Sequence, residues 1–142
     1  MKPADWPSVR AGLLLATTPL LLSGLIAGCS SNSKPAYCTA ADQLKTSVQN
    51  LGNVDVATKG LDSLKTALTG VQTSANTFAS EAKSAFASQI TALQGTLSGL
   101  ETAINSAQGQ LSASAVAAVG SSVRQVKESA GDLATAVSDK CK

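Results

Sequence analysis

The chain has 142 residues, of which 14% are charged and 3% aromatic, with three cysteines and no histidine. This length suits one domain and is short for two. The lack of histidine excludes a Ser-His-Asp triad, a Cys-His pair and a histidine metal site. A net charge of +2 is too small to indicate a basic surface that binds nucleic acid. We therefore expect a protein that is not an enzyme, with no cofactor, no metal and no nucleic-acid partner.

The start of the chain has the pattern of an export signal. Lys2 and Arg10 form a positive beginning, and residues 11–27 are an uncharged run rich in leucine. The run ends at Cys29 and is followed at once by Ser, Ser, Asn and Ser, which are too polar to continue an apolar span. Residues 1–28 are therefore predicted to be a signal peptide.

The end of this run, Ile26 to Cys29, reads Ile-Ala-Gly-Cys and resembles a bacterial lipobox. The resemblance implies that Cys29 carries diacylglycerol, that residues 1–28 are cleaved, and that lipid holds the protein at the extracytoplasmic face of the cell membrane. Two acyl chains give stable anchoring where one does not. The alternatives are an ordinary secretory signal with an incidental cysteine, or an uncleaved anchor.

The rest of the chain divides into residues 29–37, expected to be a lipidated flexible tether, and residues 38–142, expected to be a helical domain. In the latter, apolar residues recur at alternating steps of three and four, which is the spacing of helices packed as in coiled coils. No convincing strand is found. Four such segments run from Ala41 to Leu51, Leu61 to Ala85, Phe86 to Ala107 and Val116 to Val137.

The ends of these segments carry helix-boundary signals of unequal clarity. Thr39 with Asp42 resembles a capping box, Gly52 is a natural stop, and a serine within residues 112–114 suits an N-cap. The apolar phase also slips between the second and third segments, where no glycine or proline marks a turn. Either a tight turn lies within residues 83–88, or one helix of about 50 residues continues through the slip.

Cys38 and Cys141 remain as a pair if Cys29 is lipidated, and an exported protein can oxidise them. Cys38 lies at the start of the first predicted helix and Cys141 at the end of the last. In an up-down bundle, only an even number of helices brings these two ends to the same pole. We therefore predict an all-α antiparallel up-down bundle of four helices, with coiled-coil-like packing and a Cys38–Cys141 disulfide. The alternatives are one long central helix flanked by two shorter ones, and two free thiols.

Three further residue pairs are candidate sites: Glu128 with Asp132, Gly95 with Gly99, and Phe78 with Phe86. The two carboxylates share a helix face but offer too few oxygens for a cation, which favours a solvated face. The glycines would admit a neighbouring helix or a lipid chain, although an open surface explains them more simply. The two phenylalanines are expected to fill the core near the disulfide pole rather than to line a ligand pocket.

The lipobox and the cysteine-bounded domain rich in Ala, Ser and Thr make the chain similar to small helical lipoproteins of unknown function from actinobacteria. We expect a non-enzymatic interaction or structural module of the cell envelope. It would contact a protein partner, or a second copy of itself, through helix faces or through the loops at residues 53–57 and 108–114. The alternative is a carrier for a lipid or other apolar ligand, which requires an apolar pocket of roughly several hundred Å³.

Overall fold

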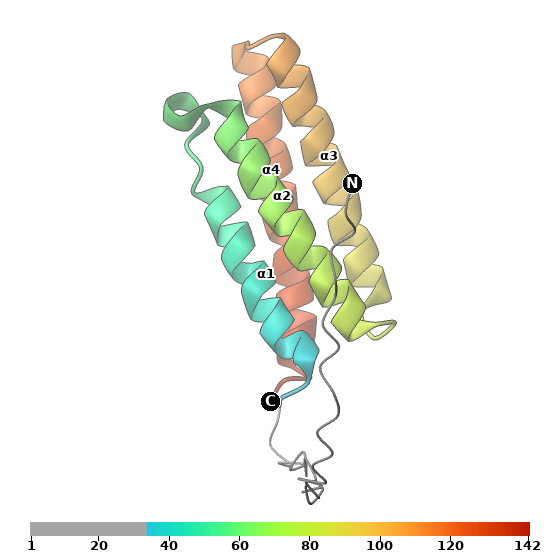
Figure 1. Ribbon diagram of the computed structural model, residues 1–142. Coiled ribbons are helices and arrows are strands. Elements are labelled where there is room, and N and C mark those ends of the chain that lie inside the picture. Colours follow the sequence, from blue (N-terminus) through green and yellow to red (C-terminus); the bar gives the residue numbers. More distant parts are fainter. Residues whose placement is uncertain (1–33) are drawn as a thin grey trace, which may run out of the picture. The chain divides into compact units, whose positions relative to one another are not determined.

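The computed structural model describes residues 34–142, which form four helices: α1 (Ala36–Gly52), α2 (Val56–Ala82), α3 (Ala87–Gly109) and α4 (Ala113–Ser138). The helices run alternately up and down, as Figure 1 shows. Each packs against its neighbours in the chain, and α4 returns to pack against α1, which closes a ring. No strand occurs in this part of the chain. The prediction of an all-α, up-down bundle of four helices is confirmed.

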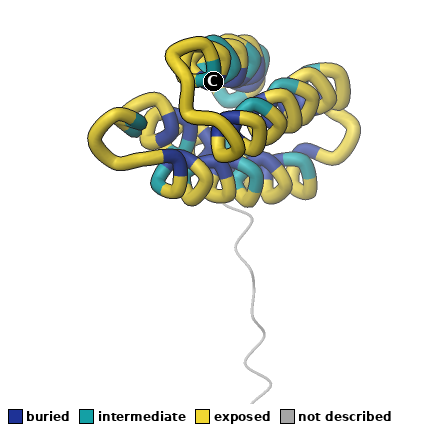
Figure 2. Tube along the Cα trace, turned by 90° about the horizontal axis from the view of Figure 1, so that it is seen from above, coloured by how far each residue is buried: buried dark blue, intermediate teal, exposed yellow. Residues whose placement is uncertain are grey.

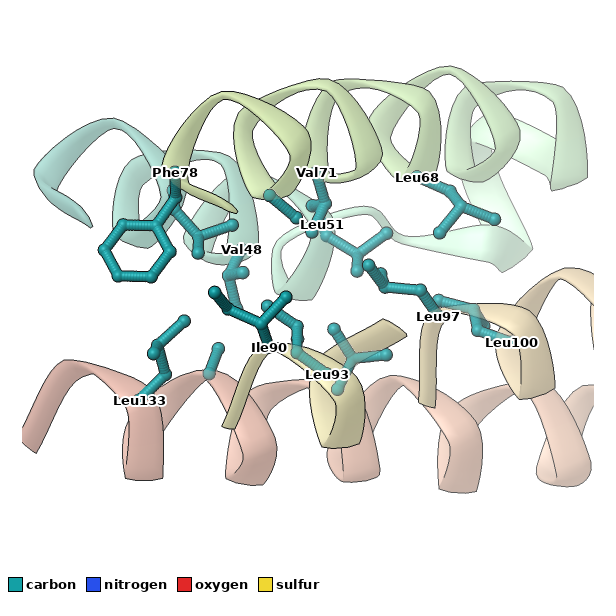
Figure 3. Close-up of a cluster of buried hydrophobic side chains, with 14 of the residues drawn as sticks. Val48, Leu51, Leu68, Val71, Phe78, Ile90, Leu93, Leu97, Leu100 and Leu133 are labelled. Atoms are coloured by element: carbon teal, nitrogen blue, oxygen red, sulfur yellow. The ribbon is translucent and has the colours of Figure 1, made fainter. Parts of the chain in front are cut away.

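The core follows the predicted seam of apolar residues. Seen from above in Figure 2, the buried positions of the four helices face one another and the exposed positions face outward. Among the largest fully buried side chains are Phe78, Leu93 and Leu100 (Figure 3). No polar or charged residue of the described part is buried. Among the described residues, the whole core cluster lies within residues 40–137, and the four helices bury it between them.

Alanine helps a chain so poor in large residues to form long helices, and these helices also accommodate many threonines. Alanine has the highest helix propensity, and the exposed threonines bond their own helix. In α2, the hydroxyls of Thr66, Thr69, Thr73 and Thr77 each donate to the carbonyl four residues back, at 2.9–3.1 Å. These bonds satisfy the hydroxyls without distant partners.

Two helix starts have side-chain caps, and one expected cap is wrong. The Asp55 carboxylate accepts a hydrogen bond from the Ala57 N–H at 3.0 Å, and Ser112 Oγ accepts one from the Ala115 N–H at 3.1 Å, which confirms a serine cap on α4. α1 instead begins after Pro35 with no side-chain cap. The capping box proposed at Thr39 and Asp42 is thus wrong, because α1 starts earlier and both residues lie inside it. Tyr37, assigned to the tether, also belongs to α1.

Residues 83–86 form the turn that separates α2 from α3, so the single long helix is wrong. The Lys83 N–H donates to the Ala79 carbonyl and the Ala85 N–H to the Ala82 carbonyl, both at 3.0 Å. Lys83 has a positive φ of 51°, a conformation that glycine usually marks. Ala85, counted in the seam, is exposed, whereas Phe86 is buried.

A kink near the start of α2 was not anticipated. Gly60 has φ 76° and ψ 173°, so the first turn of α2 is offset from the rest of the helix. This backbone region is essentially restricted to glycine. The seam also differs from expectation at the same pole, because Val116 at the start of α4 is 42% exposed rather than buried.

Candidate functional site

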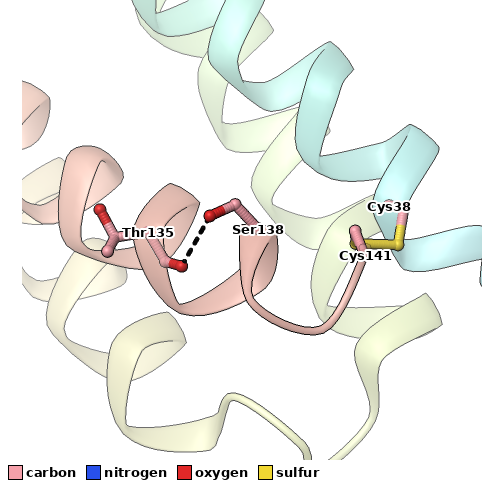
Figure 4. Close-up of a disulfide and its surroundings, with 4 residues drawn as sticks. All are labelled: Cys38, Thr135, Ser138 and Cys141. Carbon is pink, nitrogen blue, oxygen red and sulfur yellow. Dashed lines mark hydrogen bonds between the residues drawn. A yellow bond between two sulfur atoms is a disulfide. The ribbon is translucent and has the colours of Figure 1, made fainter.

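The Cys38–Cys141 disulfide joins the first turn of α1 to the segment after α4, with 6.0 Å between the two Cα atoms. Figure 4 shows the bond beside the last turn of α4, where Ser138 Oγ donates to the Thr135 carbonyl at 3.1 Å. The predicted pairing is confirmed and the alternative of two free thiols is wrong. Cys29, the predicted lipidation site, lies outside the described residues.

An aromatic cluster fills the core at the disulfide pole. The Phe86 ring lies 5.5 Å from the Tyr37 ring, in an edge-on arrangement, and 5.7 Å from the Phe78 ring, measured between centroids. Both phenylalanines are buried, and both are members of the core cluster. Their predicted place in the core near this pole is confirmed. Tyr37 is the aromatic residue that the sequence argument left out of the domain.

The carboxylate and glycine pairs lie on open surface. Glu128 and Asp132 are both exposed. Gly95 and Gly99 are exposed as well, and a Cβ built on either would meet nothing within 4 Å. These glycines therefore contact no neighbouring helix within residues 34–142. Within the described part of the chain, no group of three or more Cys, Asp or Glu residues is placed to hold a metal ion.

The pole opposite the disulfide carries exposed apolar side chains. Leu111 is 74% exposed and Val116 is 42% exposed, and no other large hydrophobic residue of residues 34–142 is exposed. Both border an open hollow of about 520 Å³ that reaches Val56 and Gly60 at the start of α2. The two loops predicted as contact surfaces therefore border one hollow, at the upper end of the bundle in Figure 1.

A second feature, the groove between α1 and α4, was not predicted. Its central hollow measures about 200 Å³. The lining from the two helices is Ala41, Leu44, Lys45, Val48 and Gln49 of α1 and Lys127, Ala130, Gly131, Leu133 and Ala134 of α4. A further open hollow of about 480 Å³ shares Lys127 and continues along α4 toward the far pole. The sequence signal was the small residues beside the seam, such as Ala41, Gly131 and Ala134, which keep the groove open.

No known protein-family model, no curated protein and no solved structure matches this chain. Of the helices in residues 34–142, none has the length and apolar character needed to cross a membrane. What supports a function is therefore the chain's own sequence and geometry.

Proposed function

We propose that the protein is a lipid-anchored lipoprotein on the extracytoplasmic face of the cell membrane and acts as a non-enzymatic interaction module. The lipobox-like residues Ile26 to Cys29 support the anchor. The Cys38–Cys141 disulfide supports export independently, because such bonds persist in oxidising compartments and are rare in the cytosol.

The anchor would also orient the domain. Residues 30–35 separate Cys29 from the start of α1. Six residues span at most about 20 Å when fully extended, so a lipid on Cys29 keeps the start of α1 close to the membrane. The disulfide lies at that pole, and the loops with Leu111 and Val116 lie at the other. The far pole is then the part of the domain best placed to meet a partner.

The observation that carries the proposal is the apolar surface at this far pole. A single exposed hydrophobic residue is ordinary, but Leu111 and Val116 border the same hollow and are the exposed large hydrophobic residues of the described part. Burying them against a protein partner would be favourable at about 25 cal/mol per Å² of apolar surface. The carrier alternative for a lipid with two acyl chains would use the α1/α4 hollow, whose volume of about 200 Å³ is small for such a ligand.

Site-specific crosslinking in the native membrane tests the interaction. A photoreactive amino acid replaces Leu111 in the full chain, and a matched control places it at Thr66, an exposed residue of α2. We expect a discrete adduct from position 111, absent from position 66 and reduced by the second-site change Val116→Ser. Equal adducts at both positions, or an adduct that V116S leaves unchanged, would contradict the proposal.

Metabolic labelling with an alkyne fatty acid tests the anchor separately. The full chain should take up label and fractionate with membranes, and Cys29→Ser should lose both properties. Cys38→Ser is the matched control, because it removes a cysteine of the same chain without touching the lipobox. Label that survives C29S would refute lipidation at this residue.

A further inference from the structure

The groove between α1 and α4 combines an apolar floor with a basic rim. Lys45 and Lys127 line its central hollow, Arg124 and Lys127 line the neighbouring one, and no carboxylate lines either of these two. Within residues 34–142, the one ion pair joins Lys142 to Asp139, so these three cations have no carboxylate within 4.0 Å in the described part. A third hollow shares Lys45 with the central one and is also lined by Asp42, so the positive charge of the groove is least compensated by carboxylates at Lys127.

The position of Lys127 concentrates this charge between the two hollows. A Cβ built on Gly52 would approach Lys127 Cδ to 3.2 Å, so the lysine stem lies across the last residue of α1. Its ammonium group thus stands at the junction that both hollows share. The acidic residues of α4 nearest in sequence, Glu128 and Asp132, line neither hollow. α4 therefore turns its cations, and not its carboxylates, toward the groove.

The floor of the central hollow suits one alkyl chain. Leucine, valine and alanine side chains make up most of the lining, and Gly131 keeps one edge low. The volume of about 200 Å³ exceeds that of an engineered apolar cavity of about 150 Å³ that binds benzene. At roughly 30 Å³ for each water-sized group, the hollow holds about seven methylene-sized groups, which suits one chain better than two.

We propose that the α1/α4 groove binds a single-chain carboxylate of medium length, with its head group at Lys127 and the first part of its alkyl chain over Ala130 and Ala134. The lysines that line the groove favour an anionic head group, and its Ala, Leu and Val side chains favour a hydrocarbon tail. This inference goes beyond the proposed interaction at the far pole, and it depends neither on that interaction nor on lipidation of Cys29. All of the groove residues lie in the described domain.

Two other occupants fit the groove less well. A second copy of the chain would bring the same cations face to face, and like charges across an interface are unfavourable. An acidic amphipathic helix has a complementary charge, but a helix is about 10 Å wide with its side chains and would rest on the rims without filling the central hollow. Charge and size together therefore favour the single-chain anion.

The test titrates the oxidised domain, residues 34–142, with dodecanoate below its micelle concentration, followed by calorimetry and by amide chemical shifts. We expect saturable one-to-one binding, with shifts at Ala130 and Ala134. Lys127→Gln should weaken binding roughly two- to fivefold, the range expected for one solvent-exposed ion pair. Lys127→Arg should restore it, and the matched control Lys65→Gln on exposed α2 surface should leave it unchanged.

Uncharged dodecanol separates two contributions to the binding affinity, the ion pair at Lys127 and the contact of the alkyl chain with the apolar lining. It should bind wild type and K127Q equally, whereas Ala134→Leu, which fills the hollow, should weaken both ligands about tenfold or more. Circular dichroism on each variant checks that the bundle remains folded. Absence of dodecanoate binding, an equal loss in K65Q, or wild-type affinity in A134L would each overturn the proposal. So would an acidic helical peptide that shifts these amides where dodecanoate does not.

Discussion

The disulfide is expected to supply a large share of the domain's stability. Cys38 and Cys141 are 103 residues apart, so the bond closes almost the whole domain into one loop. In the chain-entropy model, a cross-link that closes about 100 residues stabilises the folded state by about 4.7 kcal/mol, because it restricts the unfolded chain. Domains of this size have a total free energy of unfolding of about 5–15 kcal/mol. At about 4–5 °C per kcal/mol for a domain of this length, reduction should lower the midpoint by about 20 °C.

The assay follows thermal unfolding of residues 34–142 by circular dichroism, with and without a phosphine reductant. A Cys38→Ala/Cys141→Ala variant is the matched control, and it should unfold near the reduced wild type and ignore the reductant. Urea unfolding should also show a larger m-value for the reduced protein, because its unfolded state is more expanded. Both measurements are sensitive to the unfolded state, and the chain-entropy model attributes the stabilisation by the disulfide to that state.

A fall in midpoint of less than about 5 °C would refute this reasoning, since it corresponds to about 1 kcal/mol. Such a result would mean that the unfolded chain keeps its ends together without the bond, or that the bond strains the folded state. A double-alanine variant that still responds to reductant would instead reveal an effect of the reagent on the bundle itself. The two outcomes are therefore distinguishable.

Three substitutions test the core and the two unusual backbone positions by urea unfolding. Phe78→Ala should cost about 3–5 kcal/mol because it empties a fully buried site, whereas Leu111→Ala, its exposed counterpart, should cost less than about 0.5 kcal/mol. Gly60→Ala should destabilise by about 1–3 kcal/mol because φ is 76° there, although a Cβ has open space around it. Lys83→Gly should stabilise by about 1 kcal/mol through relief of its positive φ. An opposite sign at either backbone position would contradict the argument from φ.

The periodicity of the sequence was enough to predict packed helices, because apolar residues at steps of three and four lie on one face of a helix and can be buried together there. Residues such as Leu64, Leu97 and Val126 recur at steps of three and four, and all three are buried. The disulfide followed from the cysteines left as a pair in an exported chain, and the even number of helices followed from bringing Cys38 and Cys141 to one pole. These features depend on pattern alone, and the structure departs little from them.

The turns and the groove could not be predicted in the same way. The α2–α3 turn lacks a glycine, because Lys83 takes the positive φ itself, so the seam slip at Ala85 and Phe86 remained ambiguous. The kink at Gly60 depends on how the first turn of α2 meets the rest of the bundle. The groove forms because Ala41 of α1 and Ala134 of α4 face each other. Periodicity shows which residues of a helix are buried, but it does not show which helices pack side by side.

The place of the groove follows from how the ring closes. Connections of a few residues join α1 to α2, α2 to α3 and α3 to α4, whereas α4 and α1 are joined only through the disulfide. α1 is also shorter than α4, with 17 residues against 26, so α4 extends beyond it toward the far pole. The seam between them is thus held covalently at one end and covered at the other by the Lys127 stem over Gly52. The apolar groove therefore lies on a seam that no short connection joins, and small side chains along this seam leave it open.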